Sequence, residues 1–206
     1  MRDLAHNELA LRGVVQSWWR GLRNLNLRNG EEIPGREPDR GELAKLRRIA
    51  TAGEADLPAV ALVDALAVDS FQTLWRKVAK TFEKPLDHPL AEYAAVAAST
   101  LAWLRADTGR GDTAALLGPP RDGAVFAEAR FRRLIRTETA VDLLDQGRRI
   151  AAALKGAAPV GELGASLILW DQDPRIRRRW TFAYYHLRDM PADEPSASPI
   201  ETGADA

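Results

Sequence analysis

Apolar residues recur at helical spacing through most of the chain. Leu11, Val15, Trp18, Leu22 and Leu25 follow one another at intervals of three or four, which predicts a long first helix with a single apolar stripe. No convincing run of alternating apolar and polar residues indicates a strand. The pattern therefore predicts an all-α fold of about nine helices.

Glycine, proline and helix-capping residues separate the predicted helices. A loop rich in glycine, proline and charge is expected at 29–40, after which Asp39 is placed to cap a short second helix that Gly53 closes. The remaining helices are predicted at about 57–67, 70–82, 89–105, 124–136, 138–154, 161–170 and 173–187.

The best candidate for a boundary is the stretch 108–123, which contains several glycines and a proline pair. It predicts a linker between an N-terminal helical bundle, 1–107, and a C-terminal helical bundle, 124–188. The residues 189–206 are rich in proline, serine, alanine and acidic side chains, which is typical of a disordered acidic tail.

Composition limits the chemistry of the protein. The 206 residues include no cysteine, which excludes disulfides, thiolate metal ligands and cysteine nucleophiles. The 29 basic residues balance the 29 acidic ones, so net charge alone does not indicate a nucleic-acid binder. All but five of the basic residues are arginine, the side chain suited to bidentate phosphate contact. Codon bias in a GC-rich genome would also explain that excess, but it would not explain clustering.

The arginines cluster on three consecutive predicted helices. The clusters comprise Arg130, Arg132, Arg133 and Arg136, then Arg148 and Arg149, then Arg175, Arg177, Arg178 and Arg179. Helical phase turns most of them away from the apolar stripe, with Arg148 at its border, whereas Arg179 lies beside the stripe and is predicted to form a structural ion pair. A basic face is often simply solvated or packed against a neighbour. Three basic faces on adjacent helices, however, repel each other unless an anionic partner compensates their charge, which makes a merely solvated surface a weaker explanation.

Catalytic and metal-binding patterns are sparse. His6, His88 and His186 are not at metal-ligand spacing, and Gly161 to Gly164 lacks the spacing and the lysine of a phosphate-binding loop. The six tryptophans are interpreted as core residues. We therefore expect no enzyme activity, no cofactor and no metal. The start of the chain lacks the apolar core of a signal peptide, and its longest apolar run is too short to span a bilayer, so a cytoplasmic protein without a membrane partner is expected.

Four motifs occur in an order and at a spacing that resemble the small subunit (CasB family) of the type I-E CRISPR Cascade complex. They are Gly41–Arg48 (GELAKLRR), Ala129–Arg136 (ARFRRLIR), Leu143–Arg149 (LLDQGRR) and Trp170–Tyr185 (WDQDPRIRRRWTFAYY). The resemblance covers roughly Leu11 to Leu187. It implies an all-α protein of two small bundles, present as two copies inside a surveillance complex guided by CRISPR RNA (crRNA).

The resemblance also implies a non-catalytic role. Such a subunit joins the guide-RNA backbone assembly to the large subunit, and its basic surface holds the target and displaced DNA strands of the R-loop. The expected partners are therefore the backbone and large subunits, the crRNA, both DNA strands and a second copy of the chain.

The basic positions of the family motifs correspond to Arg47, Arg48, Arg130, Arg136, Arg148, Arg149, Arg175 and Arg177. Adding outward-facing Arg133 and Arg178 gives the predicted nucleic-acid-binding set. The alternative from another class is a helical adaptor whose arginines bind acidic surfaces of partner proteins.

Overall fold

Ten helices lie in the part of the chain that the computed structural model describes, which comprises residues 3–28, 31–34, 39–49, 58–119 and 125–187. They are α1 (Asp3–Leu22), α2 (Arg40–Ile49), α3 (Pro58–Leu66), α4 (Asp69–Thr81), α5 (Leu90–Ala102), α6 (Thr113–Leu117), α7 (Glu128–Ile135), α8 (Ala140–Ala153), α9 (Val160–Ile168) and α10 (Pro174–Tyr184). The predicted all-α class is confirmed.

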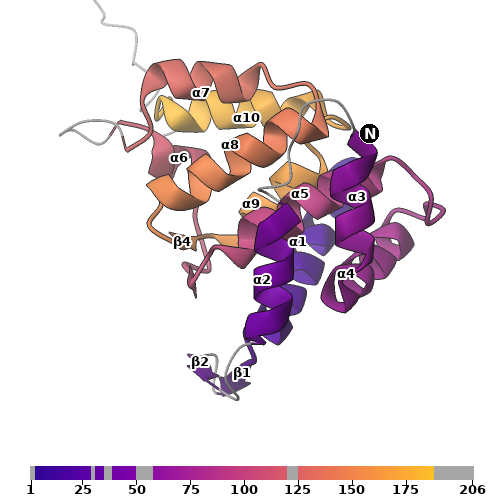
Figure 1. Cartoon of the computed structure of the whole chain (residues 1–206). Helices are drawn as coiled ribbons and strands as arrows, with labels where there is room; N and C mark the ends of the chain where they lie inside the picture. The colour runs from indigo at the N-terminus through magenta and orange to yellow at the C-terminus, as the bar shows by residue number, and fades with distance from the viewer. Residues whose placement is uncertain (1–2, 29–30, 35–38, 50–57, 120–124, 188–206) are drawn as a thin grey trace, which may run out of the picture.

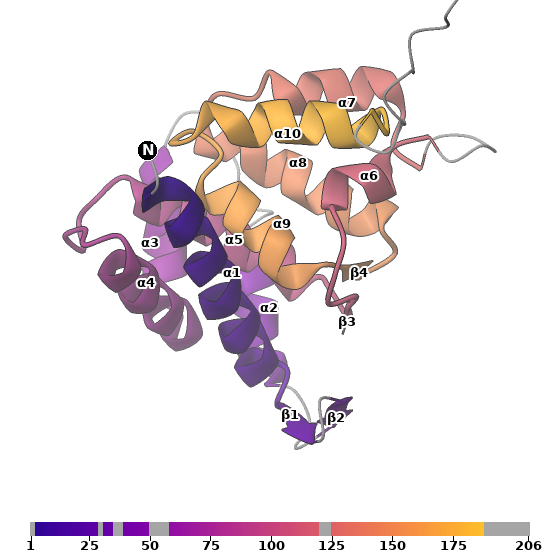
Figure 2. The ribbon, with the colours of Figure 1, turned by 180° about the vertical axis from the view of Figure 1, so that it is seen from behind.

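Helix α9 is the centre of the arrangement. All nine of its residues are buried, and it packs against both α1 and α5, while α5 in turn packs against α8. Helices α7 and α10 lie side by side at one end of the molecule (Figures 1 and 2), where the rings of Phe131 and Tyr184 stack with centroids 3.8 Å apart. The buried side chains form one apolar cluster that includes residues from both sides of the predicted linker. The division into bundles 1–107 and 124–188 stays a prediction.

Side-chain caps explain where several helices begin. The Asp39 carboxylate accepts the backbone N–H of Glu42 at 3.0 Å, as predicted for the start of α2. Thr139 Oγ1 accepts the N–H of Asp142 at 3.1 Å and donates its hydroxyl to that carboxylate at 2.7 Å, which starts α8. The predicted closing residue of α2, Gly53, and the predicted tail 189–206 lie outside the described residues.

Two short strand pairs occur that the hydrophobic pattern did not indicate. Leu25–Arg28 (β1) pairs antiparallel with Glu31–Pro34 (β2), and Ala106–Asp107 (β3) pairs in parallel with Ala157–Ala158 (β4). Asn24, with φ at 50°, ends the first helix before Leu25. Strands of two to four residues are too short to show an alternating pattern.

Helix α6 lies inside the segment 108–123 that was predicted as a linker loop. It spans only five residues, which is shorter than any window in which helical periodicity can be recognised. Its start is fixed by Asp112, whose carboxylate accepts the N–H of Ala114 at 3.1 Å. The helix then packs against α10.

A largely buried ionic network joins α1, α9 and α10. Arg179 Nη1 bonds Glu8 at 2.5 Å, and Arg179 Nη2 bonds Glu162 at 3.0 Å. Glu162 is only 5% exposed and also accepts hydrogen bonds from Thr113 and Ser166. Burial alone would lower the pKa of Arg179, but the two carboxylates outweigh it and hold the pKa above its usual value. The predicted structural ion pair of Arg179 is confirmed.

Candidate nucleic-acid interface

Two of the ten predicted binding arginines are engaged by carboxylates on their own helices. Arg149 bonds Asp145 at 2.8 Å, one turn earlier on α8. Arg175 bonds Asp173, the N-cap of α10, at 2.7 Å. The hydrogen bond from Arg175 lowers the pKa of Asp173, although burial opposes the shift. Each of these arginines therefore carries a charge that is already compensated.

The other α10 arginines contact aromatic rings. Arg177 was predicted to point away from the apolar stripe, but it is only partly exposed, with its guanidinium carbon 5.9 Å from the Trp170 ring centroid and its Nη2 3.8 Å from Asp171. Arg178 is exposed and lies 5.8 Å from the centroid of Phe182, as expected for an outer basic ridge with an aromatic residue. The ring contacts hold each guanidinium in place without neutralising it, and only Arg177 of the two has a carboxylate, that of Asp171, nearby in the described residues.

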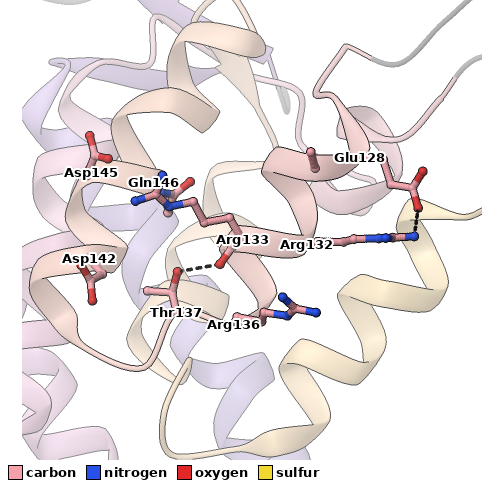
Figure 3. Close-up of a pocket in the computed structure, with 9 residues that line it drawn as sticks. Glu128, Arg132, Arg133, Arg136, Thr137, Asp142, Asp145 and Gln146 are labelled. Carbon is pink, nitrogen blue, oxygen red and sulfur yellow. Dashed lines mark hydrogen bonds and ion pairs between the residues drawn. The ribbon is translucent and has the colours of Figure 1, made fainter.

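The arginines of α7 are exposed. Arg130, Arg133 and Arg136 have no carboxylate partner among the described residues, whereas Arg132 bonds Glu128 at 2.6 Å. A hydrogen bond from Tyr185 and the pairing with Arg132 lower the pKa of Glu128. Arg133 and Arg136 also line a cavity between α7 and α8 (Figure 3).

Four arginines from separate segments converge near Trp103, the C-cap of α5, and we call this set the Trp103 cluster: Arg23, Arg47, Arg105 and Arg148. The guanidinium carbons of Arg47 and Arg148 lie 5.2 Å and 5.7 Å from the Trp103 ring centroid. Arg47 Nε also donates to the carbonyl of Ala102 at 3.0 Å. The structure therefore brings together two predicted residues that stand far apart in the sequence. The predicted neighbour Arg48 is exposed at the end of α2 and makes contacts of its own.

Arg23 is a partly buried member of the cluster and lies between α1 and the end of α5. Its Nη2 donates to the carbonyl of Ala102 at 3.2 Å, and its guanidinium lies 5.6 Å from the Trp19 ring centroid. Burial, and then the positive charges of Arg47 and Arg105, lower the pKa of Arg23 to about 10. Its Nε and the Trp103 indole N–H are buried without a partner in the described structure.

Positive charge in the Trp103 cluster is not compensated within the described residues. No carboxylate there pairs with Arg23, Arg47, Arg105 or Arg148. A cavity of about 370 Å³ opens beside the cluster and is lined by Trp103, Arg105, Arg148 and Lys155 among others. Guanidinium groups fixed on a rigid frame, with unused donors, suit phosphate oxygens, and contacts to phosphate carry no sequence information.

Sequence reasoning missed part of this cluster. Arg23 and Arg105 stand outside the arginine runs, as does Lys155 in the neighbouring cavity, and Trp103 was predicted to be core. The other five tryptophans are buried, but Trp103 is only partly buried. The only local signal was the pair Trp103 and Arg105 directly after the long apolar helix, because a tryptophan at a helix end beside arginine is typical of a surface contact.

Metal-ligand clusters and membrane-spanning helices are both absent from the described residues. No group of three or more histidine, aspartate or glutamate side chains could hold a metal ion there. None of the helices found in those ranges is long and apolar enough to cross a membrane.

Comparison with known families decides the assignment. The family described as CRISPR-associated protein Cse2 matches residues 42–185, which is well over half of the chain. The chain belongs to the Cse2 family. The resemblance to the Cascade small subunit is thereby confirmed, and membership implies a structural subunit of the CRISPR Cascade complex. No curated protein and no solved structure gives a significant match.

The uncompensated positive charge of the Trp103 cluster predicts that phosphate stabilises this Cse2 chain against heat. Because folding lowers the pKa of Arg23, its protonated form destabilises the free fold at all pH values below about 10. We expect inorganic phosphate to raise the melting temperature by about 2–4 °C more than sodium chloride of equal ionic strength does, since a bound anion offsets the cost of burying this charge and its repulsion by Arg47 and Arg105. Arg23→Met should reduce this difference. An equal response to both salts would contradict the prediction.

Proposed function

We propose that this Cse2 chain is a non-catalytic subunit of a type I-E Cascade complex that holds nucleic-acid strands by their phosphates. The observation that carries the proposal is the Trp103 cluster, four arginines without a carboxylate partner in the described residues. Two of them, Arg47 and Arg148, also match basic positions of the family motifs. The cluster suits a strand of any sequence.

Backbone contacts of this kind can decide whether an R-loop forms. Opening a target exchanges one duplex for another of similar stability, so a few contacts to the separated strands shift the balance. We infer that the target and displaced DNA strands are the principal ligands, with crRNA, the backbone and large subunits and a second copy of the chain as the other partners. A cytoplasmic location follows from this role.

The test removes the two arginines that contact Trp103. Arg47→Gln combined with Arg148→Gln should weaken target-DNA binding by the assembled complex by about tenfold or more, because two charge-assisted contacts are lost. The slope of log affinity against log salt should become flatter by roughly 0.7 to 0.9 for each lost phosphate contact. Titrations of labelled DNA at several salt concentrations measure both quantities.

A matched control removes two charges from another surface. Arg76 and Lys80 are exposed on α4, and Arg76→Gln with Lys80→Gln should change neither affinity nor slope. Arg149→Gln should have a smaller effect than Arg148→Gln, since Asp145 already neutralises Arg149. If the Arg47 and Arg148 variant failed to assemble but bound DNA normally wherever it did assemble, the adaptor alternative would replace the proposal.

A further inference from the structure

The cavity between α7 and α8 has a volume of about 610 Å³, within the range of pockets that take small ligands. Figure 3 shows its two walls, with Arg133 and Arg136 coming from α7 and its C-cap, and Asp142 and Gln146 from α8. The α7 wall therefore contributes guanidinium donors beside a Glu128 carboxylate that Arg132 and Tyr185 already engage, and the α8 wall contributes acceptors. A ligand that fills the cavity has to carry both kinds of group.

The α7 wall offers unused positive charge. Neither Arg133 nor Arg136 has a carboxylate partner in the described ranges, and both are exposed. The neighbouring Arg132 is different, because Glu128 neutralises it at 2.6 Å. Figure 3 shows the Arg133 guanidinium directed toward α8 and that of Arg136 directed away from it, so Arg133 is the group on this wall that suits a phosphodiester inside the cavity.

The α8 wall offers unused acceptors. Gln146 is only 3% exposed, and its Oε1 is buried without a donor in the part of the chain described. Asp142 accepts the Thr139 hydroxyl at 2.7 Å and retains acceptor capacity. Asp145, on the same wall, is occupied by Arg149 at 2.8 Å. Buried polar groups are rarely left unpaired, so the amide indicates a missing ligand donor.

From these two walls we propose that the cavity holds one unstacked nucleotide of a bound single strand. The phosphate binds Arg133, and the base presents its N–H groups to Gln146 and Asp142. An acidic peptide fits less well, because it would place its carboxylates against Asp142 and Asp145. The inference rests on the proposed function and extends it, since it adds a contact to a base where the Trp103 cluster contacts phosphate alone.

Helix α8 connects the cavity to the Trp103 cluster. Asp142, Asp145, Arg148 and Arg149 are all exposed on one face of this helix. Asp142 and Arg148 stand about 9 Å apart along the helix axis at 1.5 Å per residue. A nucleic-acid strand that leaves the cavity can therefore contact Arg148 over this short distance. The cavity and the Trp103 cluster then form one continuous binding path across α8.

The test compares strands that differ only in their bases. The full chain is titrated with a single-stranded oligonucleotide and with a fully abasic strand of equal length and phosphate number, at fixed salt. We expect the base-bearing strand to bind about fivefold tighter or more, and Gln146→Leu to abolish that ratio while leaving the abasic affinity unchanged. Arg133→Gln should weaken the binding of both strands by the same factor. Parallel DNA and RNA versions show which sugar the path prefers.

The controls separate this proposal from the proposed function. Arg47→Gln combined with Arg148→Gln should weaken the binding of both strands and preserve the ratio of their affinities. If the base-bearing and abasic strands bind the native chain equally, the nucleotide site is wrong and phosphate binding still stands. The same conclusion follows if the folded Gln146→Leu variant keeps the ratio of the two affinities. If neither strand binds the free chain, the nucleotide site is wrong, and the titrations of the assembled complex decide the phosphate-binding proposal separately. Should Gln146→Leu lose its helical circular dichroism, Asp142→Ala takes its place, and an unchanged ratio in that variant overturns the site.

Discussion

Replacing Arg179 with methionine is expected to lower the free energy of unfolding by about 3–5 kcal/mol, the usual cost of removing one partner from a buried ion pair. Methionine keeps much of the apolar volume but leaves Glu162, only 5% exposed, without its cation, and Glu8 without one of its two. Urea unfolding at pH 7, followed by circular dichroism, measures the change.

The matched control is Arg178→Met, on the next position of α10. Arg178 is exposed and contacts only the ring of Phe182 among the described side chains, so its loss should cost less than about 1 kcal/mol. Equal losses for the two variants would show that the ionic network contributes nothing specific.

The cost of losing Arg179 should also depend on pH. Burial alone would raise the pKa of Glu8, but hydrogen bonds from Arg12 and Arg179 outweigh it and hold the pKa below its ordinary value. A carboxyl with a lowered pKa stabilises the fold above its unfolded pKa, near 4.3, and loses that contribution as the pH falls through the folded value. The gap between native protein and Arg179→Met should therefore narrow below about pH 4. A gap that widened there would contradict the assignment.

Gly147→Ala is expected to destabilise the protein by about 2–3 kcal/mol, although alanine favours a helix more than glycine does. A Cβ at this position would overlap Thr100 Oγ1 and lie 3.2 Å from Thr100 Cβ, so α8 would have to move away from α5. Since α8 carries Arg148 and α5 ends at Trp103, the same movement should weaken DNA binding.

A double-mutant cycle tests the cause of this effect. Thr100 Oγ1 is buried without a partner in the described structure, so Thr100→Ala alone should cost little, and it should recover part of the stability lost in Gly147→Ala. Gly13→Ala, where the new methyl group meets nothing within 4 Å, should instead stabilise α1 by up to about 1 kcal/mol. If Gly13→Ala cost as much as Gly147→Ala, the contact with Thr100 would not be the cause.

Helical phase predicted the fold class and the separate role of Arg179, because both depend on one local period. The stripe of Ile176, Trp180 and Ala183 is buried as expected, and Arg179 lies beside it with its guanidinium turned into the ionic network. Such patterns are visible in the sequence since a helix repeats the same environment every three or four residues.

The Trp103 cluster could be predicted only in part, because it has no local pattern. Its arginines come from the end of α1, the last turn of α2, the segment after α5 and the middle of α8, and only tertiary packing brings them together. Arg47 and Arg148 were identified through a family resemblance, whereas Arg23 and Arg105 had no such signal. The same limit applies to Gln146, a single amide whose missing partner shows only in the folded chain.

The contact between Glu8 and Arg179 spans 171 positions, and it has a consequence for how the protein is made. A ribosome releases α1 long before α10 exists, and closing so long a loop is slow compared with local helix formation. Until α10 emerges, Glu162 lacks its cation and the central helix α9 lacks part of its cover. Chains that stop short of Arg179 should therefore remain incompletely folded and prone to aggregation, so that only finished chains are available for assembly.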